Sequence, residues 1–344
     1  MRVLCFSSFT FSYLNRARVL YQSLKRHHPD WHLVALMTDR TPAGFVFDPA
    51  VEPFDELVWH DELGIENVNA WLFQHDIVEV CTAVKGPFIE MATKRDFEAV
   101  IYLDPDTCLF NSLGPVIELL GTHDIVLTPH LLEPEQDQIA VIDNEIGPLW
   151  AGIYNLGFVA IRSTGEGARF AAWWARRLRE FCHDDRDRGL FVDQKWCDHV
   201  PVFFDKVHIL KDPGYNTASW NVNQRRITID MNGNAKANDG LLRFWHFTKL
   251  GPIGDVMTRR YARDQIAVYE LWRWYREQVG RATSPGIPDR YWAFGQFTDG
   301  TPIEKSHRVL YRHRKDLQAA FPDPFQKEFA DWLRAEGHIS LARE

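Results

Sequence analysis

The stretch that most constrains the fold is an apolar run, residues 99–103, which ends in two carboxylates, Asp104 and Asp106. Five apolar and mostly β-prone residues predict a buried strand. In open α/β sheets, ligands bind beyond the carboxyl ends of such strands. Two carboxylates at that place repel each other, and they become favourable when they share a divalent cation, which often bridges the phosphates of a substrate. The stretch therefore predicts a metal site and phosphate chemistry.

The chain contains a second pair of acids at the same spacing, Asp185 and Asp187. The spacing alone therefore does not indicate a metal site. This pair lies in the charged run 183–188, and no apolar strand precedes it. Charge runs of this kind are typical of a solvated surface turn. We therefore assign a metal or catalytic role only to Asp104 and Asp106, because acids at the end of a buried strand need a partner.

The first forty residues predict the start of a nucleotide-binding α/β domain. Residues 2–6 and 32–37 are typical of strands, and residues 13–27 have the apolar spacing of a helix between them. The loop after the first strand lacks the Gly-x-Gly-x-x-Gly pattern of dinucleotide sites. The chain also lacks the Gly-x-x-x-x-Gly-Lys-Ser/Thr pattern, which argues against a P-loop nucleotidase.

The remainder of the chain predicts further alternation of strands and helices, and hence an α/β fold. Turn-rich sequence around Gly251 and Pro252 separates a core, residues 1–254, from a mainly helical extension, residues 255–344. The further helices are expected at 71–84, 88–95, 113–120, 168–182 and 192–200, and the further strands at 56–59, 125–128, the second half of 147–161, 207–210, 227–231 and 241–244.

Composition narrows the classes of partner. A net charge of −8 argues against general attraction to nucleic acid. Five cysteines, an odd number without Cys-x-x-Cys spacing, favour reduced thiols in a cytoplasmic protein. The N-terminus lacks the layout of a signal peptide, and the longest uncharged run, 146–161, is too short to cross a membrane. We expect a soluble cytoplasmic protein.

Arginine and aromatic residues alternate at 271–276 and 310–315, in the slightly basic extension. One interpretation is a surface that binds an acceptor or the inner face of a membrane from the periphery. The other is amphipathic helices that pack tryptophan inward and arginine outward. We favour packing.

Three further segments carry polar groups at the ends of predicted strands or helices. Asn155 and Gly157 open an apolar strand, where glycine allows close approach of a ligand and asparagine can bind hydroxyls, although a simple turn would look the same. Asp193 and Gln194 stand at a helix start, either as a cap or facing a polar substrate. His246 ends a late strand, either as a core histidine or as a third metal ligand.

These motifs, taken in order, resemble those of the family 8 glycosyltransferases, which include bacterial lipopolysaccharide galactosyl- and glucosyltransferases and glycogenin. The order is a strand with Asp-x-Asp, Asn-x-Gly opening a strand, Asp-Gln, and a strand ending in histidine with a lysine after it. The resemblance covers residues 1–254 and implies the GT-A fold, a Rossmann-like core with a central mixed sheet flanked by helices. It also implies transfer of a sugar from a nucleotide diphosphate donor, a UDP-sugar first among them, to a glycan or glycolipid.

The resemblance implies a role for each matching residue. Asp104, Asp106 and His246 would ligate Mn²⁺ or Mg²⁺, which bridges the donor diphosphate. The donor nucleotide would lie against Ser8, Thr10 and Tyr13, with Tyr13 stacking on the base. Lys85 and Lys249 would face phosphate or sugar, and Asn155, Gly157, Asp193 and Gln194 would line the donor sugar and the reacting carbon. The loop 7–10 lacks the acid and amide with which family members often bind the base, and the run after His246 departs from the family pattern.

We therefore expect a metal-dependent glycosyltransferase that acts in the assembly of surface polysaccharide or lipopolysaccharide, and the resemblance favours retention at the reacting carbon. The first alternative is a phosphatase of the haloacid dehalogenase type that uses Asp104 and Asp106, although Thr107 stands one position too early for that motif. A sugar nucleotidyltransferase would need a glycine-rich first loop, which 6–12 lacks. A non-catalytic carbohydrate-binding protein with the same fold is the third alternative.

Overall fold

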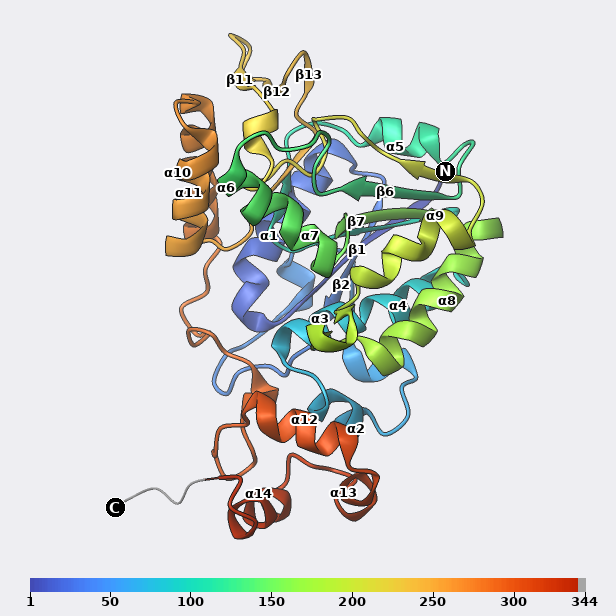
Figure 1. The fold of residues 1–344 in the computed structure, drawn as a ribbon, viewed down its shortest axis with the longest axis vertical. Coiled ribbons are helices and arrows are strands. Elements are labelled where there is room, and N and C mark those ends of the chain that lie inside the picture. Colours follow the sequence, from blue (N-terminus) through green and yellow to red (C-terminus); the bar gives the residue numbers. More distant parts are fainter. Residues whose placement is uncertain (340–344) are drawn as a thin grey trace.

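The computed structural model describes residues 1–339, and its centre is a seven-stranded mixed sheet with helices on both faces (Figure 1). The strand order is β10-β6-β7-β4-β1-β2-β3. Strand β7 runs antiparallel to both of its neighbours, whereas the other pairs are parallel. The seven strands are β1 (Val3–Phe9), β2 (His32–Met37), β3 (Glu56–Trp59), β4 (Ala99–Leu103), β6 (Ile125–Pro129), β7 (Tyr154–Arg162) and β10 (Val207–Ile209). The predicted α/β core with a central mixed sheet flanked by helices is confirmed.

The central strands are apolar at nearly every position because helices cover both faces of the sheet. Successive side chains alternate between the faces, so Cys5 belongs to one hydrophobic core and Phe6 to the other. Helices α4 (Lys85–Ala92) and α8 (Gly165–Phe181) pack on the face of Phe6, and α1 (Leu14–His27) and α5 (Gly114–Leu119) on the opposite face.

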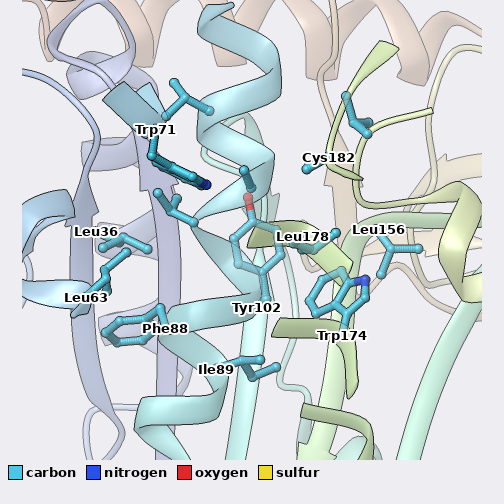
Figure 2. Packing of buried hydrophobic residues seen from close by; sticks show 14 of the residues in the cluster. Leu36, Leu63, Trp71, Phe88, Ile89, Tyr102, Leu156, Trp174, Leu178 and Cys182 are labelled. Carbon is cyan, nitrogen blue, oxygen red and sulfur yellow. The ribbon is translucent and has the colours of Figure 1, made fainter. Parts of the chain in front are cut away.

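The core beneath α4 and α8 holds the functional edge of the sheet in place. Figure 2 shows Tyr102, from β4, among Phe88 and Ile89 of α4 and Trp174 and Leu178 of α8. All five side chains are fully buried. The tight packing of these large side chains fixes the position of β4, whose last residue directly precedes Asp104.

Two antiparallel pairings bring distant segments to the carboxyl end of β4. Because β7 is antiparallel to β4, its beginning lies at this edge, with Phe158 opposite Leu103. Strand β5 (Thr107–Leu109) follows β4 and pairs with β14 (Phe244–His246), which sets His246 opposite Thr107. The other strands are β8 (Asp184–Asp185), β9 (Leu190–Phe191), β11 (Ile227–Ile229), β12 (Ala235–Ala237) and β13 (Gly240–Leu241).

The helices depart from expectation in two places: between residues 68 and 92, and at 192–200, where the structure has a short 3-10 helix, Lys195–His199, in place of the expected helix. In place of one helix over 71–84, α2 (Val68–Phe73) ends and α3 (Ile77–Ala83) starts anew, because Asp76 caps α3 by accepting from two of its backbone N–H groups. Helix α4 includes Gly86 and Pro87, since proline is tolerated in a first turn. The remaining helices are α6 (Gln138–Ala140), α7 (Ile146–Ala151), α9 (Val200–Phe203), α10 (Pro252–Ala262), α11 (Ile266–Arg281), α12 (Lys305–His313), α13 (Lys315–Ala320) and α14 (Lys327–Ala335).

The C-terminal helices form two groups. Helices α10 and α11 lie beside the sheet domain, and α12 to α14 lie at the opposite end of the molecule from β11 to β13 (Figure 1). In α11, Trp272 and Tyr275 are buried and Arg273 and Arg276 are exposed, so the packing that we favoured is confirmed there. Within residues 1–339, no helix is long and apolar enough to cross a membrane.

Candidate functional site

Asp104, Asp106 and His246 converge at the carboxyl end of β4. One potential ligand atom from each lies within 4.8 Å of the other two. The Nε2 atom of His246 is 3.1 Å from Oδ1 of Asp106 and 3.6 Å from Oδ2 of Asp104. The backbone pairing of β5 with β14 makes this possible, because the N–H of Phe247 donates to the carbonyl of Asp106. The structure thus brings together the three residues that the sequence predicted as metal ligands.

The electrostatics of this cluster favour the charged form of Asp106. Burial by itself would raise the pKa of Asp106, yet the neighbouring His246 holds it below its usual value. Burial by itself would lower the pKa of His246, and the charge of Asp106 raises it instead. Two carboxylates and one imidazole form a mixed oxygen and nitrogen donor set, which suits Mn²⁺ and also accommodates Mg²⁺. The residues therefore fit a divalent cation.

Lys85 joins the cluster to a second buried acid. Its Nζ lies 3.2 Å from Oδ1 of Asp104 and 3.0 Å from Oδ2 of Asp193, and it donates to the carbonyl of Leu156 at 3.1 Å. Burial would lower the pKa of Lys85, but the charges of Asp104 and Asp193 raise it. Burial raises the pKa of Asp193, and Lys85 opposes that rise. The shared ammonium holds the two carboxylates next to each other at the edge of the sheet.

A cavity of about 250 Å³ opens beside this charged group. The Tyr13 ring at its edge is covered on one face by the guanidinium of Arg16, 4.0 Å from the ring centroid. The positive charge of Arg16 also contributes to the low pKa of Asp106. The residues that line the cavity are Ser8, Phe9, Thr10, Tyr13, Ile77, Val78, Cys81, Thr82, Lys85, Tyr102, Asp104, Pro105 and Asp106. The cavity thus gathers the predicted nucleotide residues Ser8, Thr10 and Tyr13 with both predicted metal-binding acids.

Gly157 of β7 lies against His246, and Gln194 is hydrogen-bonded to the same strand. The carbonyl of Gly157 accepts from the N–H of Asp104, and a side chain at Gly157 would overlap the His246 ring, with Cβ 2.5 Å from Cε1. The side-chain amide of Gln194 donates to the carbonyl of Ala151 and accepts from the N–H of Leu156. We expected Gly157 to allow the close approach of a ligand. In the structure, the His246 ring approaches it closely.

Lys249 does not line the cavity, and neither do five other predicted site residues, which are buried: Asn155, Gly157, Asp193, Gln194 and His246. Lys249 is exposed, and it lies in the loop between β14 and α10 with a φ of 55°. Its predicted role toward phosphate or sugar stays a prediction.

Sequence analysis missed Arg16, Asn216 and His130. Arg16 follows Tyr13 by three residues at the start of α1, and this spacing on one helix face could have revealed it. Asn216 lies in an irregular loop, and its side-chain oxygen is 3.2 Å from Nδ1 of His246. His130 follows β6 and lies 3.1 Å from the side-chain amide of Asn155. Burial lowers the pKa of His130 to about 4, so that its ring is neutral at pH 7. No local pattern marks Asn216 or His130, because long-range pairing alone brings them here.

Comparison with known proteins gives distant relatives. No protein-family model matches the chain. The chain is similar to the uncharacterized protein YfnD of Bacillus subtilis (strain 168), with 25% identity over 233 residues that make up 67% of this chain and 72% of YfnD.

Solved structures with a similar arrangement are more divergent in sequence. One is the galactosyltransferase LgtC in complex with donor and acceptor sugar analogues, with 16% identity, 83% of this chain and 98% of that chain covered, and a TM-score of 0.45. Another is the glycosyltransferase GlyE of Streptococcus pneumoniae TIGR4, with 13% identity, coverage of 81% and 64%, and a TM-score of 0.40. A third is mouse xyloside xylosyltransferase 1, with 15% identity, coverage of 73% and 98%, and a TM-score of 0.39.

Proposed function

We propose that this chain is a metal-dependent glycosyltransferase of the GT-A type, which transfers a sugar from a nucleotide diphosphate donor to a glycan or glycolipid. The observation that carries the proposal is the meeting of Asp104, Asp106 and His246 beside a cavity that Tyr13 borders. A carboxylate and imidazole site next to an aromatic side chain suits a ligand with both a diphosphate and a base. The solved glycosyltransferases of similar arrangement agree with this assignment.

In this proposal, Asp104, Asp106 and His246 hold Mn²⁺ or Mg²⁺. The cation would neutralise the charge that develops on the departing nucleoside diphosphate. Tyr13 offers one ring face to the base, because Arg16 occupies the other. The Arg16 guanidinium adds positive charge on the side of the leaving group.

The reacting carbon is proposed to lie near Asp193 and Gln194. The carbon develops oxocarbenium character, as it does in glycoside hydrolysis, and a nearby carboxylate stabilises that charge. Lys85 fixes the carboxylate of Asp193 beside Asp104, and the backbone holds the amide of Gln194. This arrangement suits attack by the acceptor from the face that the leaving group vacates, and hence retention.

The finer points of the proposal follow from the resemblance to family 8. They are a UDP-sugar as the donor, cytoplasmic action in the synthesis of surface polysaccharide or lipopolysaccharide, and contact with a membrane surface through the basic C-terminal helices. Arg273 and Arg276 of α11 face away from the core, where they pair with Glu270 and Asp255, and they would take part in such contact.

The decisive test is a screen for nucleotide release from UDP-, GDP- and dTDP-sugars with Mn²⁺ or Mg²⁺ present. Asp106→Ala and His246→Ala should lower turnover at least ~100-fold, because mutation of a residue that only hydrogen-bonds to a metal ligand already lowers metal affinity or activity about 10–100-fold. The matched control is Asp187→Ala, which removes an exposed acid of the second Asp-x-Asp pair and should keep full activity. Absence of release from every donor, together with no thermal shift by UDP, GDP or dTDP, would contradict the proposal.

A further inference from the structure

The side chain of Asn216 connects His246 to a buried network that contains no carboxylate. Asn216 is almost fully buried, and its backbone lies in the left-handed region, with a φ of 48°, which asparagine tolerates better than most residues. Its own carbonyl accepts from the side chains of Asn221 and Arg225. The loop is therefore fixed by its own polar contacts, and the Asn216 side chain is free to face the site.

The direction of every hydrogen bond in this network follows from one backbone N–H. The N–H of Gly157 can only donate, and it points at Oδ1 of Asn155 at 3.0 Å. The Asn155 side chain is thereby fixed, with Oδ1 as an acceptor. The atom of Asn216 that lies 3.0 Å from this oxygen must be a donor, so it is Nδ2. Asn216 Nδ2 also donates to Oγ1 of Thr128 at 2.9 Å.

The other end of Asn155 gives an independent check of this assignment. If Oδ1 of Asn155 accepts, its Nδ2 must donate to Nε2 of His130, 3.1 Å away. The neutral ring of His130 then carries its proton on Nδ1. That nitrogen lies 3.2 Å from the carbonyl of Ile153, which can only accept. The hydrogen-bond directions assigned from the N–H of Gly157 and from the carbonyl of Ile153 therefore agree.

The same assignment fixes the protonation of His246. Because Nδ2 of Asn216 is turned toward Asn155 and Thr128, its Oδ1 faces His246 Nδ1 at 3.2 Å. An amide oxygen only accepts, so Nδ1 of His246 carries a hydrogen. The other ring nitrogen, Nε2, faces Oδ1 of Asp106 at 3.1 Å, and a carboxylate also only accepts. A cation bound there would take the place of the hydrogen on Nε2, while the hydrogen on Nδ1 stays with Asn216. The ring of Trp220 packs edge-on against the imidazole, 5.3 Å away, and restricts its rotation.

We propose that Asn216 is the positioning residue of this site: by accepting from Nδ1 of His246 it directs Nε2 toward Asp104 and Asp106, where a cation would bind, and Asn155 holds Asn216. The inference rests on the metal site of the proposed function. It also gives Asn155 a task in addition to any contact with the donor sugar, since both ends of its amide are engaged within the protein. A partner that orients a histidine ligand through its second nitrogen typically raises metal affinity about 10–100-fold.

The test uses the full chain and one measurement, the affinity for Mn²⁺. Titration with Mn²⁺ alone, followed by electron paramagnetic resonance, reports affinity. Asn216→Gly suits the positive φ and removes the acceptor, whereas Asn216→Asp keeps an acceptor. Asn238→Gly is the matched control, because Asn238 also has a positive φ but is exposed and lies in the turn between β12 and β13.

Mn²⁺ affinity should fall about tenfold or more in Asn216→Gly, stay near the wild-type value in Asn216→Asp, and not change in Asn238→Gly. Unchanged affinity in folded Asn216→Gly, or a loss in Asn216→Asp as large as in Asn216→Gly, would overturn the inference. Failure of the wild-type protein to bind Mn²⁺ would instead contradict the proposed function.

Discussion

At the scale of single residues, the site depends on side chains that hold other side chains. Lys85 is almost fully buried, and its ammonium has three acceptors within 3.2 Å, two of them carboxylates. A buried ion pair of this kind adds little stability by itself, but removal of one partner leaves the other charge uncompensated. The arrangement therefore ties the geometry of Asp104 to that of Asp193.

Gly157→Ala tests how closely His246 is held. The new Cβ would lie 2.5 Å from Cε1 and 2.7 Å from Nδ1 of His246, closer than real contacts allow, so the imidazole must move. We expect Mn²⁺ affinity to fall by at least about tenfold and stability by about 1–3 kcal/mol, as measured by metal titration and urea unfolding. Gly147→Ala in α7, where a new Cβ meets nothing within 4 Å, is the control and should change neither the affinity nor the fold. Unchanged Mn²⁺ affinity in Gly157→Ala would show that His246 is not a ligand.

The sequence revealed the site residues better than it revealed their partners. The apolar run before Asp104 and the motif at Asn155 and Gly157 are local signals, and the structure brings these residues together with His246. The contact between Asn216 and His246 depends on an irregular loop, whose position is set by long-range packing rather than by periodicity. The side-chain hydrogen bonds of Asn155 could not be predicted either, because the sequence is the same whether its amide is free or hydrogen-bonded within the protein.

At the scale of elements, the packing of α4 against α8 sets the position of the charged cluster. Helix α4 begins at Lys85, and the next residue, Gly86, faces the backbone of α8 at Ala175. A sequence-based expectation ended a helix near Gly86 and Pro87, because both residues are poor helix formers. The structure places them in a first turn, where proline costs little and glycine allows the two helices to touch.

Gly86→Ala should separate these two helices. A Cβ at this position would lie 2.8 Å from Cα of Ala175, and backbone atoms cannot move aside as a flexible side chain can. We expect a loss of about 1–3 kcal/mol in the free energy of unfolding, measured with urea, and weaker Mn²⁺ binding, because Lys85 shifts with α4. The control is Gly280→Ala in α11, which meets nothing within 4 Å and should be neutral or stabilising by up to about 1 kcal/mol. Equal stability of the two variants would contradict the close contact.

At the scale of the whole molecule, the C-terminal helices share the core of the sheet domain. The hydrophobic cluster that contains Phe6 and Phe88 also contains Phe294, Tyr311 and Phe329. The fully buried Arg308 of α12 donates to the carbonyls of Phe73, His75 and Phe294. Sequence analysis expected a boundary near residue 254, which stays a prediction. The composition of the sequence changes near residue 254. The contacts that join the two parts, between residues more than 200 positions apart, leave no local pattern in the sequence.

Asp39 is the carboxyl group that links the end of β2 to this C-terminal part. It is fully buried and accepts from the backbone N–H groups of Phe11, Arg40 and Ala293, while the Trp292 indole donates to the carbonyl of Thr38. Burial raises the pKa of Asp39 to about 7, from an ordinary value of 3.8, and the three N–H donors offset only part of that rise. Between these two pH values, the folded protein holds this proton more tightly than the unfolded chain does.

The pH dependence of stability should therefore carry a contribution from Asp39 with a definite sign. Because the folded state binds more protons, the free energy of unfolding falls as pH rises from about 4 to about 7, by at most ~4 kcal/mol from this group. Asp39→Asn cannot titrate, so it should lose this fall, although the amide pays a constant cost where its NH₂ meets one of the N–H donors. Urea unfolding of both proteins at pH 4.5 and pH 7.5 measures the difference in slope, which cancels the titration of all other groups. Identical slopes would mean that Asp39 titrates normally, and thus that the contact between β2 and residues 292–293 is open to water in solution.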